Sequence, residues 1–223
     1  MYTEEQMKSF ENKIINMDCL DFLKKCPDNY FSLVLTDPPY GKQYARGKNG
    51  WGVCDNRPDI KDVSWDNQTP QKELFDEIIR VSKNQIIFGG NYFTDKLPVS
   101  NCWICWDKIG NNINKSVFAD CELAWTSYNK VCRKFVSVSM GFIKDDKSER
   151  IHPTQKPTDL FEKILQNYSQ ENDLVLDCFS GSGTTAIACH NLKRRFICIE
   201  KDFDYWKASV ERLEEHQRQL SLF

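Results

Sequence analysis

The segment DLVLDCFSGSGTTAIAC, residues 173–189, joins an apolar run to a glycine-rich turn and decides the fold. Its first part is typical of a strand buried on both faces of a sheet, because the residues from Leu174 to Leu176 are all apolar. Gly181 and Gly183 then allow a tight turn and a close approach of the backbone to a ligand. The residues after the turn predict a helix, whose first N–H groups are free to bind that ligand. Strand, turn and helix in this order predict an α/β fold with a binding site at the turn.

An acidic residue after the next predicted strand indicates what kind of ligand the glycine turn takes. Glu200 ends the strand RFICIE, where its carboxylate can accept hydrogen bonds from two ribose hydroxyls. The turn and the acid together therefore fit a nucleoside. A methyl donor and a nicotinamide dinucleotide both contain a nucleoside, and this motif alone does not choose between them.

The rest of the chain alternates between apolar runs and amphipathic stretches, with no internal repeat. Strands are expected over residues 13–18, 30–37, 85–91, 102–108, 121–128, 173–181 and 195–200, and helices over 19–29, 70–82, 158–169, 182–194 and 202–220, with Thr158 as an N-cap. The basic segment 128–151 is expected to be irregular. This alternation predicts a doubly wound, mostly parallel sheet in a single domain that spans residues 1–223.

The composition is that of a globular chain with one core and gives no sign of a membrane segment. The 223 residues are 40% hydrophobic and 28% charged, with a formal net charge of -2. None of the apolar runs reaches the roughly 18 residues that span a bilayer. The polar, acidic N-terminus does not have the pattern of a signal peptide. We therefore expect a cytoplasmic protein that has no membrane partner.

The cysteines predict reduced thiols and no metal site. Cys102 and Cys105 form one C-x-x-C pair, whereas a zinc site needs a second pair at suitable spacing. Several of the other cysteines stand inside apolar runs, where they behave as small buried hydrophobic residues.

A second unusual motif, Asp37-Pro38-Pro39-Tyr40, directly follows another apolar run. The prolines fix the backbone and donate no N–H, so the acid before them and the ring after them are held in a defined geometry. When two such motifs follow parallel strands, they lie at the carboxyl edge of the sheet, where these folds bind their ligands. We expect this turn and the glycine turn to belong to one site.

The residue types in this turn suit a planar base that carries an amino group. An exocyclic amine is a poor nucleophile because its lone pair is delocalised into the ring. The carboxylate of Asp37 and the carbonyl of Pro38 can each accept one of its N–H bonds, which favours a pyramidal nitrogen, and Tyr40 can stack on the base. This is catalysis by positioning and electrostatic stabilisation, and it requires no nucleophilic cysteine.

Together, the motifs resemble those of the amino-group DNA methyltransferases, which methylate adenine N6 or cytosine N4. TDPPYG (36–41) precedes HPTQKP (152–157) and LDCFSGSGTT (176–185), an order that looks like the β class of that family. The likeness also covers NMDCLDFL, IIFGGNYF, CWICWDK, CELAWTS and FICIE. It implies a Rossmann-like fold of circularly permuted motif order, S-adenosylmethionine as methyl donor and DNA as substrate. Because the family's DPPY form leans towards adenine and its SPPY form towards cytosine, it also implies adenine N6 as the target.

The resemblance also implies roles for individual residues. The target base is held by Asp37, Pro38, Pro39 and Tyr40. Asp18 lies near the donor adenine, Glu200 binds its ribose, and Lys156 can pair with its carboxylate, while His152 orients its own loop. The donor pocket comprises Asp18, Cys19, Thr154, Gln155, Lys156, Asp177, Phe179, Ser180, Gly181, Ser182, Gly183, Thr184, Thr185, Glu200 and Lys201. An aspartate at position 183 is expected to block donor binding without unfolding the chain.

Two basic segments are expected to contact DNA. The loop 41–68 carries Lys42, Arg46, Lys48 and Trp51, which can bind phosphates and stack on bases. The segment 128–151 carries Arg133 and Lys134 where the family has its target recognition, and it is too short for a large recognition domain. The resemblance further implies a homodimer and a cognate restriction endonuclease as possible partners.

Four other readings stay open at this point. The same residues would serve a cytosine-N4 DNA methyltransferase, and a similar proline-containing turn presents amides in enzymes that methylate RNA or protein. A nicotinamide-linked oxidoreductase would leave DPPY and HPTQKP without a role. A non-catalytic DNA-binding module would not need the intact Asp37 and glycines.

Overall fold

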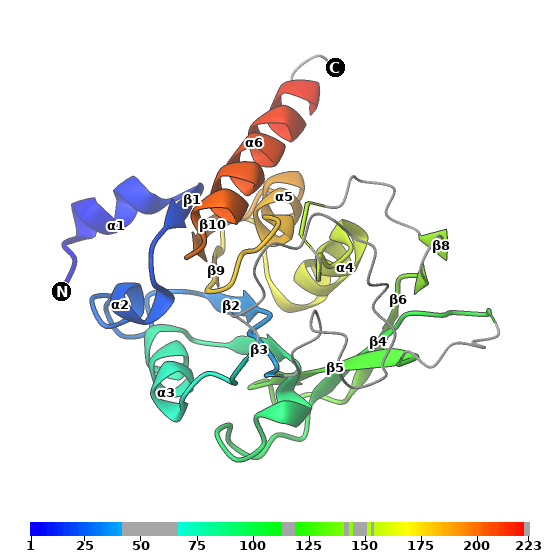
Figure 1. Cartoon of the computed structure of the whole chain (residues 1–223). Helices are drawn as coiled ribbons and strands as arrows, with labels where there is room; N and C mark the ends of the chain where they lie inside the picture. The colour runs from blue at the N-terminus through cyan, green and yellow to red at the C-terminus, as the bar shows by residue number, and fades with distance from the viewer. Residues whose placement is uncertain (42–66, 113–118, 141–142, 145–150, 153, 221–223) are drawn as a thin grey trace.

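A computed structural model describes residues 1–41, 67–112, 119–140, 143–144, 151–152 and 154–220. Among these residues, eight strands form one sheet in the order β1-β10-β9-β2-β3-β5-β4-β6, and β5 alone is antiparallel to its neighbours (Figure 1). The strands are β1 Lys13–Asn16, β2 Leu33–Thr36, β3 Gln85–Phe88, β4 Trp103–Asp107, β5 Cys121–Thr126, β6 Arg133–Val136, β9 Leu174–Asp177 and β10 Arg195–Glu200. The mostly parallel α/β fold expected from the sequence is confirmed.

The order of the strands reverses between β9 and β2. From β9 the chain continues outwards through β10, whereas from β2 it continues in the opposite direction through β3. The two strands pair directly in parallel, with Leu33 opposite Val175 and Val34 opposite Leu176. Folds of this kind bind ligands in the crevice at such a reversal, outside the carboxyl ends of the strands.

Helices cover both faces of the sheet and leave its carboxyl edge open for the loops. The helices are α1 Glu4–Phe10, α2 Cys19–Leu23, α3 Lys72–Val81, α4 Thr158–Tyr168, α5 Thr184–Asn191 and α6 Phe203–Leu220. Helices α4, α5 and α6 pack over one face, around Leu33, Leu35 and Phe88. Helices α1, α2 and α3 pack over the other, around Val34 and Ile87. Both faces of β2 are buried, which is why Leu33, Val34 and Leu35 are all apolar; the buried Thr36 ends the strand.

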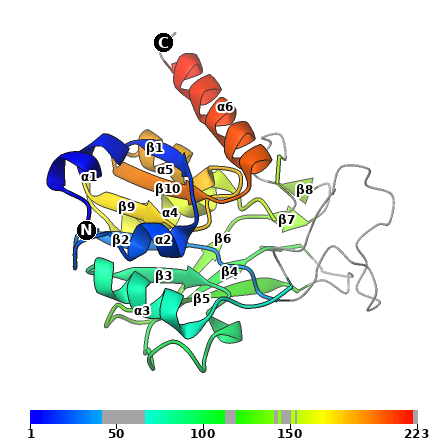
Figure 2. The same ribbon diagram turned by 60° about the vertical axis from the view of Figure 1, so that its left-hand side comes forward.

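The longest helix reaches beyond the sheet. Figure 2 shows α6 extending away from the body with the C-terminus at its far end. The helix packs against the sheet through Trp206, whose indole N–H donates to the Ile14 carbonyl at 2.9 Å, and through the buried Ser209 and Leu213. Within the described part of the chain, no helix combines the length and the apolar surface needed to cross a bilayer.

Two expectations about secondary structure are wrong. The segment 128–151 is not irregular throughout, because β6 pairs with β4 at the sheet edge and β7 Ser139–Met140 pairs with β8 Ile143–Lys144. The strand β6 has the sequence RKFV and is largely exposed, so it lacks the apolar pattern that marks a buried strand. Thr158 is not an N-cap either: it is the first helical residue of α4, and Pro157 precedes it in extended conformation without a side-chain cap.

Candidate active site

The turn that begins at Asp37 and the glycine turn lie side by side. They follow β2 and β9, the two strands at the reversal point. The hydroxyl of Thr36 donates to Asp177 Oδ1 at 2.8 Å and accepts from the Cys178 backbone N–H at 3.2 Å. The last residue of each strand is therefore fastened to the other strand, and the two turns start from one rigid base.

Asp177 is a buried latch for the glycine turn. Its carboxylate accepts from the Phe179 N–H at 3.0 Å and from the Thr185 hydroxyl at 2.5 Å, in addition to Thr36. Burial raises the pKa of Asp177 to about 6, although these hydrogen bonds act in the opposite direction. The resemblance placed Asp177 in the pocket for the methyl donor. In the structure its carboxylate instead accepts hydrogen bonds from Thr36, Phe179 and Thr185.

Replacing Asp177 with asparagine is expected to flatten the pH dependence of stability. A carboxyl whose folded pKa lies above its unfolded pKa stabilises the fold at low pH, and that stability is lost as the pH rises through about 6. The amide does not titrate. The unfolding free energy, measured by urea denaturation between about pH 4 and 7, should therefore change less in the variant than in the wild type. Parallel curves for the two proteins would contradict a titrating Asp177, and the exposed Asp95→Asn serves as control.

The two glycines of the turn do different work. Gly181 has φ +50°, and its N–H donates to Glu200 Oε2 at 2.7 Å. Gly183 has φ +76° and caps α5, and a Cβ there would stand 3.1 Å from Ile14 Cδ1 and 3.3 Å from Ser209 Cβ. A side chain at position 183 would therefore meet the packing of α6 and β1. This packing argues against the expectation that an aspartate at 183 leaves the fold intact, because the variant would bury a charge in this contact at a strained backbone position.

Acceptors suited to a nucleoside gather at the ends of β1 and β10. Glu200 ends β10 with its carboxylate half-buried, and burial raises its pKa. Each of its oxygens accepts one backbone N–H, from Gly181 at 2.7 Å and from Asp202 at 2.9 Å, and a carboxylate oxygen has a second lone pair for a ligand hydroxyl. Asp18 caps α2 at the end of β1, and Lys201 Nζ lies 3.0 Å from Asp18 Oδ2. The residues present therefore fit a nucleoside whose ribose hydroxyls are free to donate hydrogen bonds.

The neighbours of these residues line the same edge. Cys19 begins α2, and burial raises the pKa of its thiol to about 12. Phe179 packs against the core cluster below the turn. Ser180 and Ser182 are buried, and the Ser182 hydroxyl lies 3.1 Å from the Thr184 hydroxyl.

His152 and residues 154–157 lie next to the glycine turn. The His152 ring stands at Tyr205, with ring centroids 4.3 Å apart, and would be 3.5 Å from a Cβ on Gly181. Burial and the nearby Lys156 lower the pKa of His152 to about 4, so the ring is neutral. Its Nδ1 accepts from the Thr154 N–H at 3.3 Å, and Gln155 Oε1 accepts from the Ile151 N–H at 3.1 Å. This agrees with a histidine that orients its loop.

Lys156 joins the two turns, but with its ammonium on the opposite side from the one implied by the resemblance. Its carbonyl accepts from the Thr184 hydroxyl at 3.1 Å, on the glycine side. Its Nζ donates to Asp37 Oδ2 and lies 3.2 Å from Glu122 Oε2. The ammonium is therefore neutralised by protein carboxylates, and a pairing with the carboxylate of a donor is not the arrangement that the structure shows.

Asp37 accepts hydrogen bonds on both oxygens. The Tyr40 hydroxyl donates to Oδ1, and Lys156 donates to Oδ2. Burial raises the pKa of Asp37, and Glu122 adds to this effect against the opposing Lys156. The side chain is 17% exposed, and each carboxylate oxygen has a second lone pair for a further donor.

An aromatic platform surrounds Tyr40. Its ring centroid lies 5.0 Å from that of Tyr92, which is 36% exposed and follows β3 in the short helix Gly90–Tyr92. A Cβ on Gly89 would come within 2.1 Å of the Tyr40 ring, so only glycine fits beneath it. Pro38 is buried and Pro39 is partly exposed beside this platform. The space next to Asp37 is thus bordered by flat apolar surface, which suits a planar ring.

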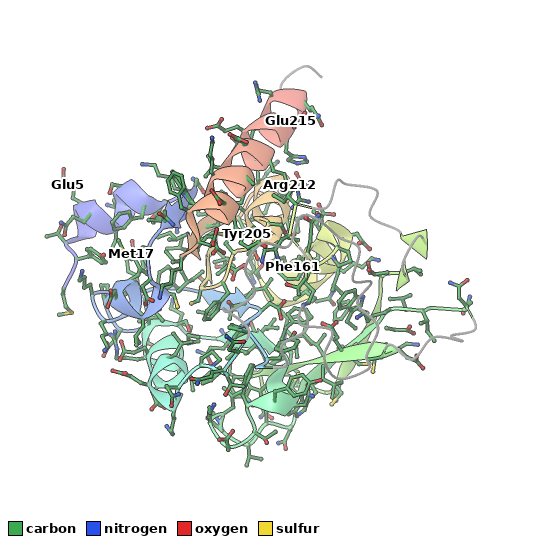
Figure 3. The ribbon with its side chains drawn as sticks, viewed as in Figure 1. Glu5, Met17, Phe161, Tyr205, Arg212 and Glu215 are labelled. Atoms are coloured by element: carbon green, nitrogen blue, oxygen red, sulfur yellow. The ribbon has the colours of Figure 1, made fainter. Side chains whose placement is uncertain are left out.

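The sequence did not reveal four residues of this region: Lys108, Glu122, Tyr92 and Arg212. Tyr92 lies in the quoted IIFGGNYF motif, whose aromatic after the glycines was the available signal. Arg212 lies on α6 (Figure 3). Its NH1 donates to the Ser182 carbonyl at 2.9 Å, which links α6 to the glycine turn. Glu122 and Lys108 form an ion pair of 2.6 Å, and a lone acid in an apolar strand sequence gives no indication of its partners.

The residues expected to contact DNA are only partly placed. Lys42, Arg46, Lys48 and Trp51 lie outside the described residues, as does most of the loop 41–68. Arg133 and Lys134 lie exposed on the edge strand β6, where Lys134 Nζ is 3.1 Å from Asp107 Oδ2.

Comparison with known proteins finds one family over residues 92–211 and relatives along most of the chain. The family described as DNA methylase matches residues 92–211, more than half of the 223 residues. The type II methyltransferase M2.MboI of Moraxella bovis is 28% identical over 96% of this chain and 91% of its own.

Solved structures share the fold. The complex of M1.HpyAVI with S-adenosylmethionine matches with a TM-score of 0.57 and 24% identity, over 90% of this chain and 98% of its own. The cytosine-N4-specific PvuII DNA methyltransferase matches with a TM-score of 0.57 and 15% identity, over 92% and 91%. At these identities the likeness shows the fold alone.

Proposed function

The chain belongs to the DNA methylase family, whose members methylate amino groups of bases, and from this premise we propose that it transfers a methyl group from S-adenosylmethionine to N6 of adenine in DNA. The observation that carries the proposal is the side-by-side placement of the Asp37 turn and the glycine turn on the paired strands β2 and β9. One turn offers an acceptor for an amine and the other offers a cradle for a nucleoside donor.

Asp37 is proposed to act on the amine of the target base. When bound, the donor supplies an electrophilic methyl group on a sulfonium. The Asp37 carboxylate and the Pro38 carbonyl accept the two amine N–H bonds, which turns the nitrogen lone pair towards that methyl group. The amine gains positive charge as the new bond forms, and the adjacent carboxylate stabilises it. The raised pKa of Asp37 also suits a group that receives the amine proton.

Tyr40 and Tyr92 are proposed as the stacking surface for the base. Their rings form a tilted pair, and Tyr92 is the more exposed of the two. A base that is paired in a duplex cannot stack on these two rings, so the target nucleotide leaves the DNA helix. Stacking on aromatic rings offsets part of the cost of unstacking.

The donor is proposed to lie along the ends of β9, β10 and β1. Glu200 accepts from the ribose hydroxyls, and Asp18 lies near the adenine. The remaining residues proposed around it are Cys19, Thr154, Gln155, Phe179, Ser180, Gly181, Ser182, Gly183, Thr184, Thr185 and Lys201. Asp177 supports this wall through its hydrogen bonds to Thr185 and Phe179. Lys156 is assigned to the base side of the site.

DNA is proposed to approach the carboxyl edge of the sheet. Arg133 and Lys134 on β6, together with the basic residues of the loop 41–68, would contact phosphates. A second copy of the chain and a cognate restriction endonuclease stay predictions, and the type II naming of the relative from Moraxella bovis fits the second of them.

Adenine N6 is favoured over cytosine N4 because Asp, and not Ser, opens the proline turn. The fold does not discriminate, since the PvuII enzyme is cytosine-N4-specific and shares it. Cytosine N4 is therefore the second candidate within the same chemistry.

The proposal predicts that the purified chain transfers labelled methyl groups to genomic DNA from a host without DNA methylation. After digestion of the DNA to nucleosides, the label should co-elute with N6-methyl-2′-deoxyadenosine in chromatography. Label in N4-methylcytosine would leave the methyl transfer standing and reverse the choice of base. Transfer to RNA or protein but not to DNA would overturn the substrate assignment.

Ligand binding separates the proposal from a dinucleotide-linked oxidoreductase. S-adenosylhomocysteine should raise the melting temperature of the protein, because it binds the folded state alone. NADH at the same concentration should leave the melting temperature unchanged. The opposite pattern would contradict the donor site.

A further inference from the structure

Four side chains of alternating charge form a continuous row that begins at Asp37. Lys156 Nζ donates to Asp37 Oδ2 and lies 3.2 Å from Glu122 Oε2, and Lys108 Nζ donates to Glu122 Oε1 at 2.6 Å. These residues come from distant parts of the sequence: the turn after β2, the loop before α4, strand β5, and the residue after β4. The fold has therefore gathered two carboxylates and two ammonium groups into one place.

The row is buried, and its most enclosed member is Lys156. The Lys156 side chain is 8% exposed, and its ammonium lies over the rings of Phe88, Tyr40 and Trp106, at 5.4, 5.7 and 5.9 Å from their centroids. An ammonium held among three rings and two carboxylates has little freedom to move. Its position fixes the oxygen of Asp37 that it touches.

Glu122 has no part in the proposed contacts with base or donor, yet its burial is costly. Its side chain is 23% exposed, and burial would raise its pKa, but the ammonium groups of Lys156 and Lys108 outweigh burial and lower the pKa to about 2. Glu122 is thus a permanent anion within reach of the same ammonium that contacts Asp37. A lysine paired with Asp37 alone would neutralise it more completely.

We propose that Glu122 is a positioning residue for methyl transfer. It holds the Lys156 ammonium at Asp37 Oδ2 and shares the positive charge of that ammonium with Asp37. This inference rests on the proposed function. Without Glu122, the Lys156 ammonium would pair with Asp37 alone and neutralise more of its charge. The Asp37 carboxylate would then be a weaker hydrogen-bond acceptor for the amine. Lys108 completes the row by holding Glu122 from the other side.

The effect on pH dependence has a definite sign. The groups that face Asp37 are Lys156, Glu122, the Tyr40 hydroxyl and the buried Asp177. Glu122 raises the pKa of Asp37, so its removal lets Lys156 lower that pKa. If methyl transfer requires ionised Asp37, the acid limb of the kcat profile then moves to lower pH in the variant.

The test compares wild type with Glu122→Gln, which keeps the shape of the side chain and removes its charge. We expect kcat to fall by about tenfold, the scale of one lost contact to a charged group. KM for the donor should stay within about twofold, since Glu122 lies on the base side. The acid limb of kcat should move down by roughly one pH unit. The matched control is Glu73→Gln, whose carboxylate pairs with Lys24 at the surface and is 57% exposed.

The outcomes separate this inference from the function on which it rests. A wild-type protein that transfers no methyl group to DNA would defeat the proposed function. An active wild type with an unchanged Glu122→Gln variant would defeat the positioning role alone. A variant with a lower melting temperature but an unmoved acid limb and unchanged kcat would show a merely structural role and would also overturn the inference. Lys108→Met provides a second variant and should move the same limb to higher pH, because Glu122 then draws more of the Lys156 charge.

Discussion

Replacing Asp37 with alanine is expected to abolish methyl transfer while donor binding persists. The carboxylate is the acceptor that orients the amine and stabilises its developing charge, so its loss should lower kcat by at least about 1000-fold. Most of the proposed donor residues follow β1, β9 and β10, whereas Asp37 accepts its hydrogen bonds from Tyr40 and Lys156. The affinity for S-adenosylhomocysteine, measured by calorimetry, should therefore stay close to that of the wild type.

Two further variants serve as controls for this result. Asp37→Asn keeps the shape and one acceptor oxygen but removes the charge, and it should lose nearly as much activity as the alanine variant. The exposed Asp95→Ala should keep full activity. Equal loss of transfer and donor binding in Asp37→Ala would contradict the role assigned to this residue, as would an active Asp37→Asn.

Replacing Lys156 with methionine is expected to cause the largest loss of stability. The ammonium compensates two carboxylates, Asp37 and Glu122, in a buried site where its own side chain is 8% exposed. Removing the ammonium leaves Asp37 and Glu122 buried without that partner, which lowers the free energy of unfolding by about 3–5 kcal/mol. The variant should also lose methyl transfer, because Asp37 then lacks its fixed partner. Urea denaturation at neutral pH measures the first effect.

The loss caused by Lys156→Met should shrink as the pH falls. In the wild type the pKa of Glu122 is lowered to about 2, so Glu122 stabilises the fold above its unfolded pKa, and this stability is lost as the pH falls towards about 2. In the variant Asp37 and Glu122 lose the ammonium that lowers their pKa values, so they take up protons at higher pH than in the wild type, which removes the penalty. The two stability curves should therefore converge in acid. Lys8→Met, which removes a surface pair with Glu4, should follow the wild type at every pH. A constant offset between the Lys156 variant and the wild type would count against the buried cluster.

The sheet was predictable because its central strands are short runs of apolar residues with no competing pattern. The strands β2, β3 and β9 are buried at every position, and each is followed by a motif with a defined turn chemistry. Parallel strands place their carboxyl ends at one edge, so the neighbourhood of Asp37 and Gly181 followed from the sequence.

Other parts could not be predicted, for identifiable reasons. The edge strand β6 has polar residues on an exposed face and no apolar alternation. The charge row from Asp37 to Lys108 depends on contacts between residues far apart in sequence, such as Lys156 with Asp37, which no local pattern encodes. The same holds for Gly183: a glycine motif predicts a close approach, but only the packing of Ser209 shows that the approach is to α6.

The proposed methyl transfer requires that the Asp37 turn and the glycine turn bind the two reactants of one reaction. A crystal structure of the protein with S-adenosylhomocysteine tests this directly. We predict that the ribose lies on Glu200, that the adenine lies near the ends of β1 and β10, and that the sulfur faces the Asp37 carboxylate. A ligand bound elsewhere, or one whose sulfur points away from Asp37, would contradict the claim.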